Sequence, residues 1–323
     1  MKTEISVVIP VLNDAGGIER CLRSIQSQRD EHSAVSSILV CDGGSRDGTR
    51  DVVGRLAADD ARIVLLHNEH KTVPHAMNLA VRHATTPVVV RVDSHAALAD
   101  DYVDTAVREL EETGADVLGG PMVPVGRDRV GRAVAWALTH RVGAGGASFH
   151  RSGVSGPAES VYMGVFPAAT FARFGPFDTA FTRNQDDEYT YRVNEQGGLV
   201  YLSAQLRSTY EPRGSVRAVW RQFYQYGLFK PLVLRKHPSG IKARHVAPSS
   251  ALLLWGLALL GGRRRIAALP LLGYLTVVLA SCRDRSPSVW GARLVVVLAM
   301  HLGYGLGFAV TLVGGSGRQR ARL

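Results

Sequence analysis

The chain has 323 residues, enough for one large domain with an appendage or for two modest domains. Its 38 lysine and arginine residues outnumber 28 aspartate and glutamate residues, and the net charge is +10. This basic excess is typical of proteins that bind nucleic acid, an anionic membrane surface or an acidic small molecule. The basic residues gather after residue 205 beside apolar runs, and the first half has no arginine-rich helix or aromatic RNA-binding platform. We therefore expect a membrane surface as a partner and no nucleic acid.

Cysteine spacing and the N-terminal segment bear on the cellular compartment. Cys21, Cys41 and Cys282 are far apart and match no zinc-binding or disulfide spacing, so we expect small core or membrane residues in a reducing compartment. The opening "MKTEISVVIP" has only a short apolar run, interrupted by Glu4 and Pro10, and is not a secretory signal peptide. The first half is therefore expected in the cytoplasm.

Apolar runs alternate with amphipathic segments over the first hundred residues. The runs predict buried strands at 5–10, 37–41, 62–66 and 88–92. The segments between them predict helices at 18–25, 49–58 and 75–84, where apolar residues recur with helical spacing. Apolar strands without alternation, separated by amphipathic helices, predict a parallel sheet covered on both faces. A further strand and turn are expected at 116–126.

Two aspartates directly follow predicted strands, Asp42 after the second and Asp93 after the fourth. Ligands of such sheets bind beyond the carboxyl ends of the strands, so both acids are expected at one crevice. In the loop "DGGSRDGT" (42–49) the glycines permit close approach of a ligand, and Asp42 can accept hydrogen bonds from a base or ribose. The alternative is a tight strand-to-helix turn capped by Asp or Ser. The loop is neither GxGxxG nor a Walker loop.

The tripeptide "DSH" (93–95) offers a carboxylate and an imidazole together. Asp93 can hold a divalent cation, with His95 as a further ligand or as a contact to a diphosphate. Mg²⁺ accepts one or two carboxylates plus phosphate oxygens, whereas Mn²⁺ tolerates imidazole better. The alternative is a helix cap at Ser94 and a solvated His95.

The run "NQDDE" (184–188) contains three consecutive carboxylates. Neighbouring side chains cannot all face one ligand, so one would act as a base while the others make hydrogen bonds or salt bridges. The alternative is a solvated acidic turn. Burial is indicated by the flanking aromatic residues Phe177, Phe181, Tyr189 and Tyr191. Burial raises the pKa of a carboxylate, which suits a general base.

The Gly- and Ser-rich segment 143–157 predicts a mobile lid or surface loop. From residue 215 the chain mixes Arg and Lys with Trp, Phe, Tyr and Leu, a pattern typical of an interfacial helix. Three apolar runs follow, at about 247–262, 266–282 and 292–315.

The third of these runs is long enough to span a bilayer, and the first two are near the lower limit. If all three spanned, "RRR" at 263–265 would face outward, against the positive-inside rule. A re-entrant or interfacial hairpin for 247–282 removes the conflict. We therefore predict membrane association and leave the topology of the hairpin open.

Taken in order, these segments resemble the family 2 glycosyltransferases. The matches cover roughly residues 4–230 and are "VVIPVLND", "VCDGGSRDGT", the helix with Asn78 before "VVVRVDSHA", "FGPFD", "NQDDEY" and "RQFYQYG". Within that family the sequence is most similar to bacterial exopolysaccharide transferases of the succinoglycan type, which also carry a membrane tail. The resemblance implies a GT-A α/β fold, with helices on both faces of a mostly parallel sheet, followed by a C-terminal helical membrane region.

The composition after residue 215 and the resemblance together predict a division of the chain into four parts. These are a catalytic domain, an amphipathic interfacial helix with a basic linker, hydrophobic membrane-associated helices and a basic tail, at 1–213, 214–246, 247–315 and 316–323. The implied reaction is a metal-dependent, inverting transfer of a sugar from a nucleotide diphosphosugar.

Carried over residue by residue, the resemblance implies a donor site. Pro10, Asn13 and Asp42 would line the nucleoside pocket. Asp93 matches the first acid of the family's DxD motif and would bind the donor through Mg²⁺ or Mn²⁺. His95 stands where the second acid usually is and would be a further metal ligand.

The resemblance implies an acceptor side as well. Asp186 matches the acid that deprotonates the acceptor hydroxyl, with Asp187 as the second candidate. Arg221, Gln222 and Tyr226 resemble a shortened QxxRW motif and would lie near the acceptor or the membrane. The tryptophan of that motif is missing, so processive polymerisation is not inferred.

The expected function is therefore transfer to a saccharide acceptor, expected to be lipid-linked, in exopolysaccharide or cell-envelope glycan synthesis. The expected location is the cell membrane, with the catalytic domain facing the cytoplasm. One alternative is a polyprenyl-phosphate sugar transferase. Another is a non-catalytic nucleotide-sugar-binding scaffold, which only the DxH departure from DxD favours. A missing GxGxxG after the first strand argues against an NAD-dependent oxidoreductase.

Overall fold

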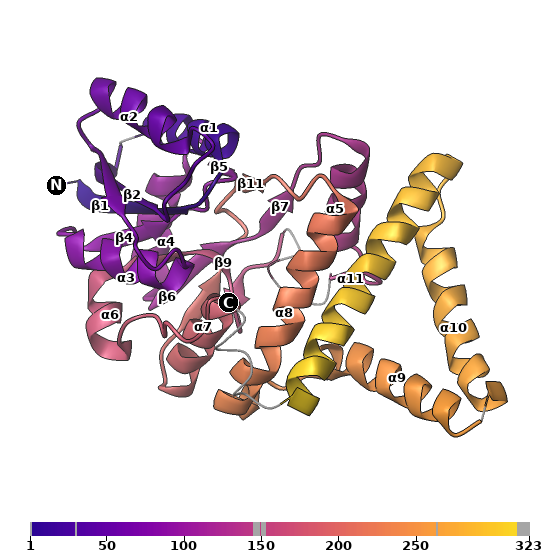
Figure 1. Ribbon diagram of the computed structural model, residues 1–323. Coiled ribbons are helices and arrows are strands. Elements are labelled where there is room, and N and C mark those ends of the chain that lie inside the picture. Colours follow the sequence, from indigo (N-terminus) through magenta and orange to yellow (C-terminus); the bar gives the residue numbers. More distant parts are fainter. Residues whose placement is uncertain (1, 30, 145–148, 150–152, 263, 315–323) are drawn as a thin grey trace. The chain divides into compact units, whose positions relative to one another are not determined.

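The computed structural model (Figure 1) describes most of the chain as two compact units. The first unit comprises Met1–Val123 and Ser148–Tyr210, and the second comprises Pro124–Ala147 and Glu211–Leu323. Pro124–Ala147, which lies within the range predicted as the catalytic domain (1–213), thus belongs to the second unit. The described residues are 2–29, 31–144, 149, 153–262 and 264–314. Of the segment expected as a lid or surface loop (143–157), residues 145–148 and 150–152 lie outside them, as does the tail 316–323.

Among the described residues, eight strands of the first unit form one mixed sheet. They are β1 (Thr3–Val11), β2 (Ser33–Asp42), β3 (Ile63–His67), β4 (Val88–Arg91), β6 (Val117–Gly120), β8 (Gly156–Pro157), β9 (Tyr162–Pro167) and β10 (Val200–Leu202). Their order is β3-β2-β1-β4-β9-β6-β10-β8. The four N-terminal strands are mutually parallel, which confirms the prediction made for them. β9 runs antiparallel to β4 and β6, and β8 runs antiparallel to β10.

Helices cover both faces of this sheet. This confirms the prediction made from strands whose residues are apolar throughout and do not alternate between apolar and polar. In β1 the side chains of Ile5, Val7 and Ile9 pack into one core, whereas Val8 packs into the other. The first core is completed by α1 (Ala15–Gln26), α2 (Thr49–Asp59) and α4 (Tyr102–Thr113). The second core is completed by α3 (Val73–His83), α6 (Ala168–Phe174) and α7 (Gln185–Glu195). The central strands are buried on both faces, so they carry no polar alternation.

A second, three-stranded sheet has the order β5-β11-β7. Its strands are β5 (Ala96–Leu98), β7 (Met122–Pro124) and β11 (Ser208–Tyr210). The "DSH" tripeptide therefore lies between two strands, β4 of the large sheet and β5 of the small one. Because both ends of this short connection are paired, its position is closely constrained.

Asp104 on α4 connects that helix to the segment before β2. Its carboxylate accepts hydrogen bonds from the backbone N–H groups of Glu31 (3.0 Å), His32 (3.2 Å) and Ser33 (2.9 Å), and from the Ser33 hydroxyl. Asp104 is only 7% exposed. Burial alone would raise its pKa, but the hydrogen bonds outweigh burial and the pKa of Asp104 is lowered. This carboxylate therefore stabilises the first unit in its charged form.

We expect Asp104→Ala to lower the free energy of unfolding by about 2–4 kcal/mol, because three backbone N–H groups lose their acceptor. A lowered pKa also means that this stabilisation is fully present above the unfolded value, about 4, and is lost as the pH falls below it. Thermal unfolding of the full chain in detergent at pH 7 and pH 3 would measure both effects. Asp100→Ala, at an exposed aspartate of the preceding loop, is the control and should change little.

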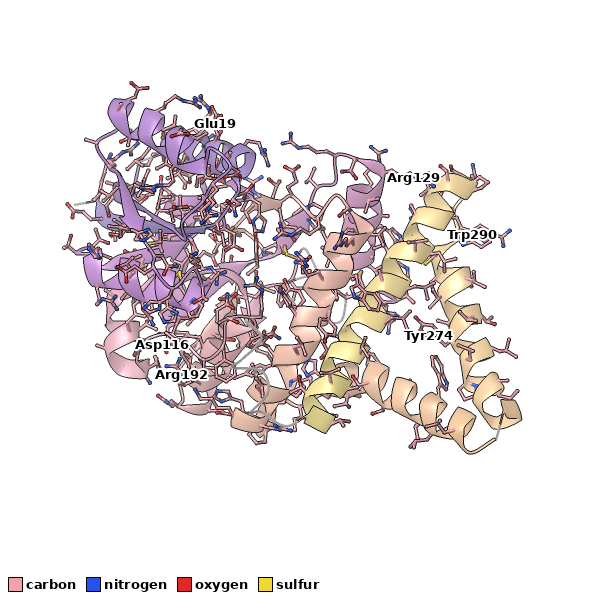
Figure 2. All side chains as sticks on the ribbon, viewed as in Figure 1. Glu19, Asp116, Arg129, Arg192, Tyr274 and Trp290 are labelled. Carbon is pink, nitrogen blue, oxygen red and sulfur yellow. The ribbon has the colours of Figure 1, made fainter. Side chains whose placement is uncertain are left out.

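The described elements of the second unit are helical. They are α5 (Arg129–Thr139), α8 (Val216–Lys236), a short 3₁₀ turn (Pro238–Gly240), α9 (Ala243–Leu260), α10 (Arg264–Cys282) and α11 (Pro287–Gly314). Figure 1 shows α8 alongside α11, while α9 and α10 meet at one end and diverge from there. Tyr274 of α10, labelled in Figure 2, hydrogen-bonds through its hydroxyl to His301 Nδ1 of α11 (2.9 Å). Arg129 of α5 donates to the carbonyl of Ser288 (2.6 Å).

Glycines let the backbones of α8 and α11 approach closely. A Cβ atom added to Gly307 would collide with the carbonyl of Tyr224, and one added to Gly227 would collide with the carbonyl of Tyr304. Small residues at the contact between two helices are typical of tightly packed membrane helices. The Thr311 hydroxyl donates to the carbonyl of Leu228 (2.9 Å) at the same contact.

We expect Gly307→Ala to destabilise this helix pair by about 1–3 kcal/mol, because the new methyl group cannot be accommodated without a backbone shift. Gly291→Ala is the matched control on the same helix, since a Cβ there meets no atom within 4 Å. The control should gain up to about 1 kcal/mol of helix propensity. Circular dichroism during heating in detergent measures both, and equal effects of the two substitutions would contradict the packing argument.

Among the described residues, α11 is the one helix long and apolar enough to cross a membrane, judged by length and composition; its mean hydropathy is 1.9. Half of that apolar stretch is buried within the chain. The apolar parts of α9 (Pro248–Ala258) and α10 (Ala268–Cys282) are shorter. Leucines on both are largely exposed, namely Leu254 (65%), Leu257 (66%), Leu260 (88%), Leu269 (73%) and Leu272 (59%).

Candidate active site

The candidate site lies at the carboxyl edge of the parallel strands. Asp42 is the last residue of β2, and Asp93 follows two residues after the end of β4. β1 lies between these two strands. The chain adds β2 and β3 on one side of β1 and then returns to add β4 on the other side. Such a reversal of strand order is where open α/β sheets bind their ligands. At about 4.8 Å per strand, Asp42 and Asp93 begin about 10 Å apart along this edge.

Asp42 stabilises its own loop. It is 1% exposed, and its carboxylate accepts hydrogen bonds from the N–H groups of Gly44 (3.0 Å) and Ser45 (3.1 Å). Arg50 lies 3.8 Å from the same carboxylate. This geometry is that of the capped strand-to-helix turn, the alternative interpretation of the "DGGSRDGT" loop. The glycines keep the loop's backbone free of side chains where a ligand would approach.

The loop after β1 is tied to the loop after β2. The Asn13 side-chain oxygen accepts the N–H of Arg46 (2.8 Å), and the Asn13 N–H donates to the Ser45 hydroxyl (2.8 Å). Asn13 has a φ of 53°, a left-handed conformation that asparagine tolerates better than most residues. Pro10 is the next-to-last residue of β1, opposite Cys41 of β2. The three residues expected in the nucleoside pocket thus lie on β1 and on these two joined loops.

The "DSH" tripeptide is held by Asp14 at the start of α1. The Ser94 hydroxyl donates to Asp14 Oδ2 (2.6 Å) instead of capping a helix, and His95 Nδ1 lies 3.9 Å from the same oxygen. Asp14 also accepts the N–H of Gly17 as the N-cap of α1 (3.2 Å). The His95 side chain is 29% exposed, and its ring meets Tyr210 edge-on at 5.1 Å. Asp14 therefore orients the residues on the C-terminal side of Asp93.

Arg91 brings Asp93 and Asp186 together although they are 93 residues apart in the chain. Its Nε and one Nη donate to Asp93 Oδ1 (3.1 and 2.9 Å), and its other Nη pairs with Asp186 Oδ1. The guanidinium is buried, with the Arg91 side chain 7% exposed, whereas the Asp186 side chain remains 41% exposed. One side of the Asp186 carboxylate is thus open to a substrate.

The two carboxylates of this cluster have opposite pKa shifts. For Asp93, burial raises the pKa, but Arg91, His95 and the adjacent Tyr162 hydroxyl outweigh burial, so its pKa is lowered. For Asp186, desolvation by the surrounding protein is the dominant cause although part of the side chain is exposed, and it raises the pKa to about 6; Arg91 opposes this shift, whereas Asp93 and Asp187 reinforce it. Asp93 therefore remains anionic, while Asp186 is poised to exchange a proton near neutral pH.

The acidic run separates over the first turn of α7, which begins after Asn184 in a left-handed conformation (φ 57°). Asp186 meets Arg91, whereas Glu188 is fully buried and pairs with Arg192 (2.9 Å), which Figure 2 labels. Asp187 accepts a long hydrogen bond from the Asn184 amide (3.4 Å). The flanking residues Phe177, Phe181, Tyr189 and Tyr191 are buried, as the sequence indicated.

Met163 contacts the backbone of Asp93. The Asp93 N–H donates to the Met163 sulfur (3.4 Å), and Met163 has a φ of 48°, which is rare for a residue other than glycine. The pairing of β9 with β6 shifts register beside it, between Leu118 and Gly120. This local bulge turns the Met163 side chain toward the backbone of Asp93.

The residues present fit a divalent cation that is bound mainly by substrate. An anionic carboxylate and an imidazole, Asp93 and His95, are a donor pair that Mn²⁺ accepts. Within the described parts of the chain, no group of three or more His, Cys, Asp and Glu side chains is arranged to hold a metal ion. Other ligands would therefore have to be diphosphate oxygens or water, as is common for Mg²⁺ in nucleotide sites.

Arg221, Gln222 and Tyr226 lie on α8, in the second unit. The Gln222 side-chain amide donates to the Tyr226 hydroxyl (2.9 Å), one helical turn away, and Arg221 is exposed. These three residues therefore share one helix, and their role at the acceptor or the membrane stays a prediction.

Sequence reasoning missed Arg91, Asp14 and Met163. The signal for Arg91 was present, because a cation inside the apolar strand "VVVRV" must find a partner when that strand is buried. Asp14 stands in "VLND", in the position of a helix cap. Met163 gives no such signal, since its role depends on a backbone conformation that no short pattern encodes.

Comparison with known proteins identifies the family. The family model described as "Glycosyl transferase family 2" matches residues 6–164. The succinoglycan biosynthesis protein ExoA of Rhizobium meliloti is 30% identical over 317 residues, covering 95% of this chain and 94% of that protein. The chain belongs to glycosyl transferase family 2. The prediction drawn from the sequence motifs is thus confirmed.

Two further likenesses extend over most of this family 2 glycosyltransferase. A dolichyl N-acetyl-α-D-glucosaminyl phosphate 3-β-D-2,3-diacetamido-2,3-dideoxy-β-D-glucuronosyltransferase of Methanococcus voltae is 25% identical, covering 72% of this chain and 74% of that protein. The mannosyltransferase PcManGT from Pyrobaculum calidifontis, solved in complex with GDP-Man and Mn²⁺, superposes with a TM-score of 0.60 at 21% identity, covering 94% and 87% of the two chains. This likeness shows the GT-A fold that was predicted.

Proposed function

We propose that this family 2 glycosyltransferase is a membrane-associated, inverting enzyme that transfers a sugar from a nucleotide diphosphosugar to a lipid-linked saccharide. The observation that carries the proposal is the cluster of Asp93, Arg91 and Asp186 at the carboxyl edge of the sheet. It supplies an anionic carboxylate for the donor side and a second carboxylate, with a pKa of about 6, for the acceptor side. These are the two functions that such a transfer requires.

The reaction needs one proton transfer by the protein. Asp186 is the proposed base: it takes the proton of the acceptor hydroxyl as the oxygen attacks the anomeric carbon. The new carbon–oxygen bond forms on one face while the bond to the diphosphate breaks on the other, so the nucleoside diphosphate leaves with the bonding electrons. Attack from the opposite face inverts the anomeric configuration. Asp187, the neighbouring candidate, reinforces the raised pKa of Asp186.

The donor side would hold a divalent cation. Asp93 and His95 are the proposed ligands, with Mg²⁺ or Mn²⁺ neutralising the charge that develops on the departing diphosphate. Asp14 keeps this pair in place through Ser94 and through its approach to His95. Mn²⁺ in the related GT-A mannosyltransferase structure supports this proposal.

The nucleoside would lie against the joined loops after β1 and β2. Pro10, Asn13 and Asp42 are the proposed donor-binding residues there. Because Asp42 and Asn13 fix the backbone of these loops, we propose that they act chiefly by shaping the pocket. GDP-Man in the structure of the related mannosyltransferase supports a nucleotide sugar as donor.

A lipid-linked acceptor is consistent with the second unit. The apolar helix α11 and the exposed leucines of α9 and α10 would be covered by lipid, because apolar surface of this extent is costly in water. We propose that residues 247–282 enter one leaflet as a hairpin and that the first unit faces the cytoplasm, where nucleotide sugars are made. Likeness to a succinoglycan biosynthesis protein supports a role in exopolysaccharide or cell-envelope glycan synthesis.

A transfer assay tests the proposal. The full chain in detergent would be incubated with Mn²⁺, a set of radiolabelled nucleotide sugars, and either polyprenyl phosphate or polyprenyl-diphosphate-linked saccharides as acceptor. We expect label in the saccharide product alone. Transfer to polyprenyl phosphate itself would establish the rival lipid-phosphate reaction. Binding of nucleotide sugar without transfer or hydrolysis under any condition would identify a scaffold.

A further inference from the structure

Arg91 is a cation in the middle of the proposed catalytic cluster, two residues before Asp93. It is 6% exposed, and all three of its nitrogen groups have carboxylate partners: two donate to Asp93 Oδ1 and the third pairs with Asp186 Oδ1. The two carboxylates come from different elements, the connection after β4 and the first turn of α7. Arg91 is thus a direct physical link between the proposed donor and acceptor sides.

The backbone around Arg91 is held by its pairing with the central strand of the sheet. Arg91 pairs in register with Val8 of the central strand β1, and the adjacent Val92 N–H donates to the Val8 carbonyl (2.9 Å). Because side chains two residues apart in an extended chain point to the same side, Arg91 and Asp93 start from the same face. The Arg91 side chain therefore extends from a fixed backbone position to Asp186.

We propose that Arg91 is a positioning residue that sets the separation and orientation of Asp93 and Asp186, so that metal site and base act on the same bound donor. The inference rests on the proposed function. The proposed role requires the planar guanidinium of arginine, which can hold two carboxylates at once with two donors in one direction and one in another. A lysine ammonium offers only a single, flexible point of contact.

A purely structural role is the competing explanation. Buried ion pairs add little net stability, because the cost of removing both charges from water offsets their attraction. An apolar side chain at position 91 would leave Asp93 and Asp186 without their cation, so the two carboxylates would repel each other and separate, at a cost in stability. The first unit contains a pair suited for comparison, Arg173 with Asp116 (3.0 Å), in which the arginine is 54% exposed.

The test compares Arg91→Lys, Arg91→Met and the control Arg173→Lys in the full chain. We expect Arg91→Lys to lower kcat about 30-fold and Arg91→Met at least 100-fold, with the donor KM changed less than threefold. Arg173→Lys should keep kcat within twofold. Thermal unfolding with and without Mn²⁺ and nucleoside diphosphate identifies the folded variants, and Arg91→Lys decides the matter if Arg91→Met does not fold.

A double-substitution cycle separates this inference from the proposed function. If Arg91 acts by aligning Asp93 with the base, Arg91→Lys should cost much less than 30-fold in an Asp186→Asn background, because one of the two carboxylates that it aligns is already absent. A kcat of folded Arg91→Lys within twofold of the unsubstituted enzyme, or a full 30-fold additional loss in the Asp186→Asn background, would overturn the inference. Full activity of Asp186→Asn itself would instead overturn the base assignment in the proposed function.

Discussion

Asp186→Asn is expected to lower kcat by about 10³-fold while leaving the donor KM within about threefold, because the amide cannot accept the acceptor proton. The substitution keeps the size of the side chain, and 41% of that side chain is exposed, so the fold should persist. Release of nucleoside diphosphate in the presence of acceptor measures the rate. Thermal unfolding of the same preparation verifies the fold.

Asp187→Asn is the matched control for this experiment, since Asp187 is the neighbouring carboxylate on the same helical turn. We expect its kcat to fall less than tenfold, through the modest influence of Asp187 on the pKa of Asp186. The opposite ranking, with Asp187→Asn inactive and Asp186→Asn active, would transfer the role of base to Asp187.

The same assignment predicts a pH dependence. Asp186 acts as a base only when it is ionised, and its pKa is raised to about 6. Activity should therefore fall as the pH drops through about 6 and approach a plateau above about 7. A profile of kcat between pH 5 and pH 8 would test this, with stability monitored in parallel. A rate that is flat down to pH 5 would contradict a base with this pKa.

Removal of the metal, or of its proposed carboxylate ligand, is the second change with a large expected effect. EDTA should abolish transfer and Mn²⁺ should restore it. Asp93→Asn should lower kcat/KM by about 10²–10³-fold, because the developing diphosphate charge loses its counterion. The metal alone is expected to bind weakly, since Asp93 and His95 are the two protein ligands that we propose for it.

A binding measurement complements the rate. Mn²⁺ with nucleoside diphosphate should raise the unfolding temperature of the unsubstituted chain, and Asp93→Asn should lose most of that shift. Asp59→Asn, at an exposed position on α2, is the control and should retain it. Transfer that persists in EDTA would show that cationic side chains neutralise the diphosphate instead, and the proposed metal site would be wrong.

The local sequence was sufficient to predict the first half of the sheet. The apolar runs of β1, β2, β3 and β4 and the helices between them were found because burial on both faces leaves an unbroken apolar signal. Asp42 and Asp93 were placed at the carboxyl edge for the same reason: each directly follows a strand. The later strands were harder to predict, since β8, β10 and β11 have only two or three residues each.

Within the acidic run, the sequence supplied the candidates and the structure separated them. Successive residues of a helix are about 100° apart, so Asp186 and Glu188 point in nearly opposite directions once the helix start is known. That start depends on Asn184 in a left-handed conformation. Glu188 then enters the core and pairs with Arg192, while Asp186 faces the site.

The sequence by itself determined the family, the order of the main elements and the residues able to carry chemistry, because these depend on local pattern and on side-chain type. The tertiary structure alone decided which of those residues meet. Arg91 joins Asp93 to Asp186, which is 95 positions away from it, and Asp14 orients Ser94 from 80 positions away. Such contacts are set by how strands and helices pack in space, and separation along the chain contains no information about that packing.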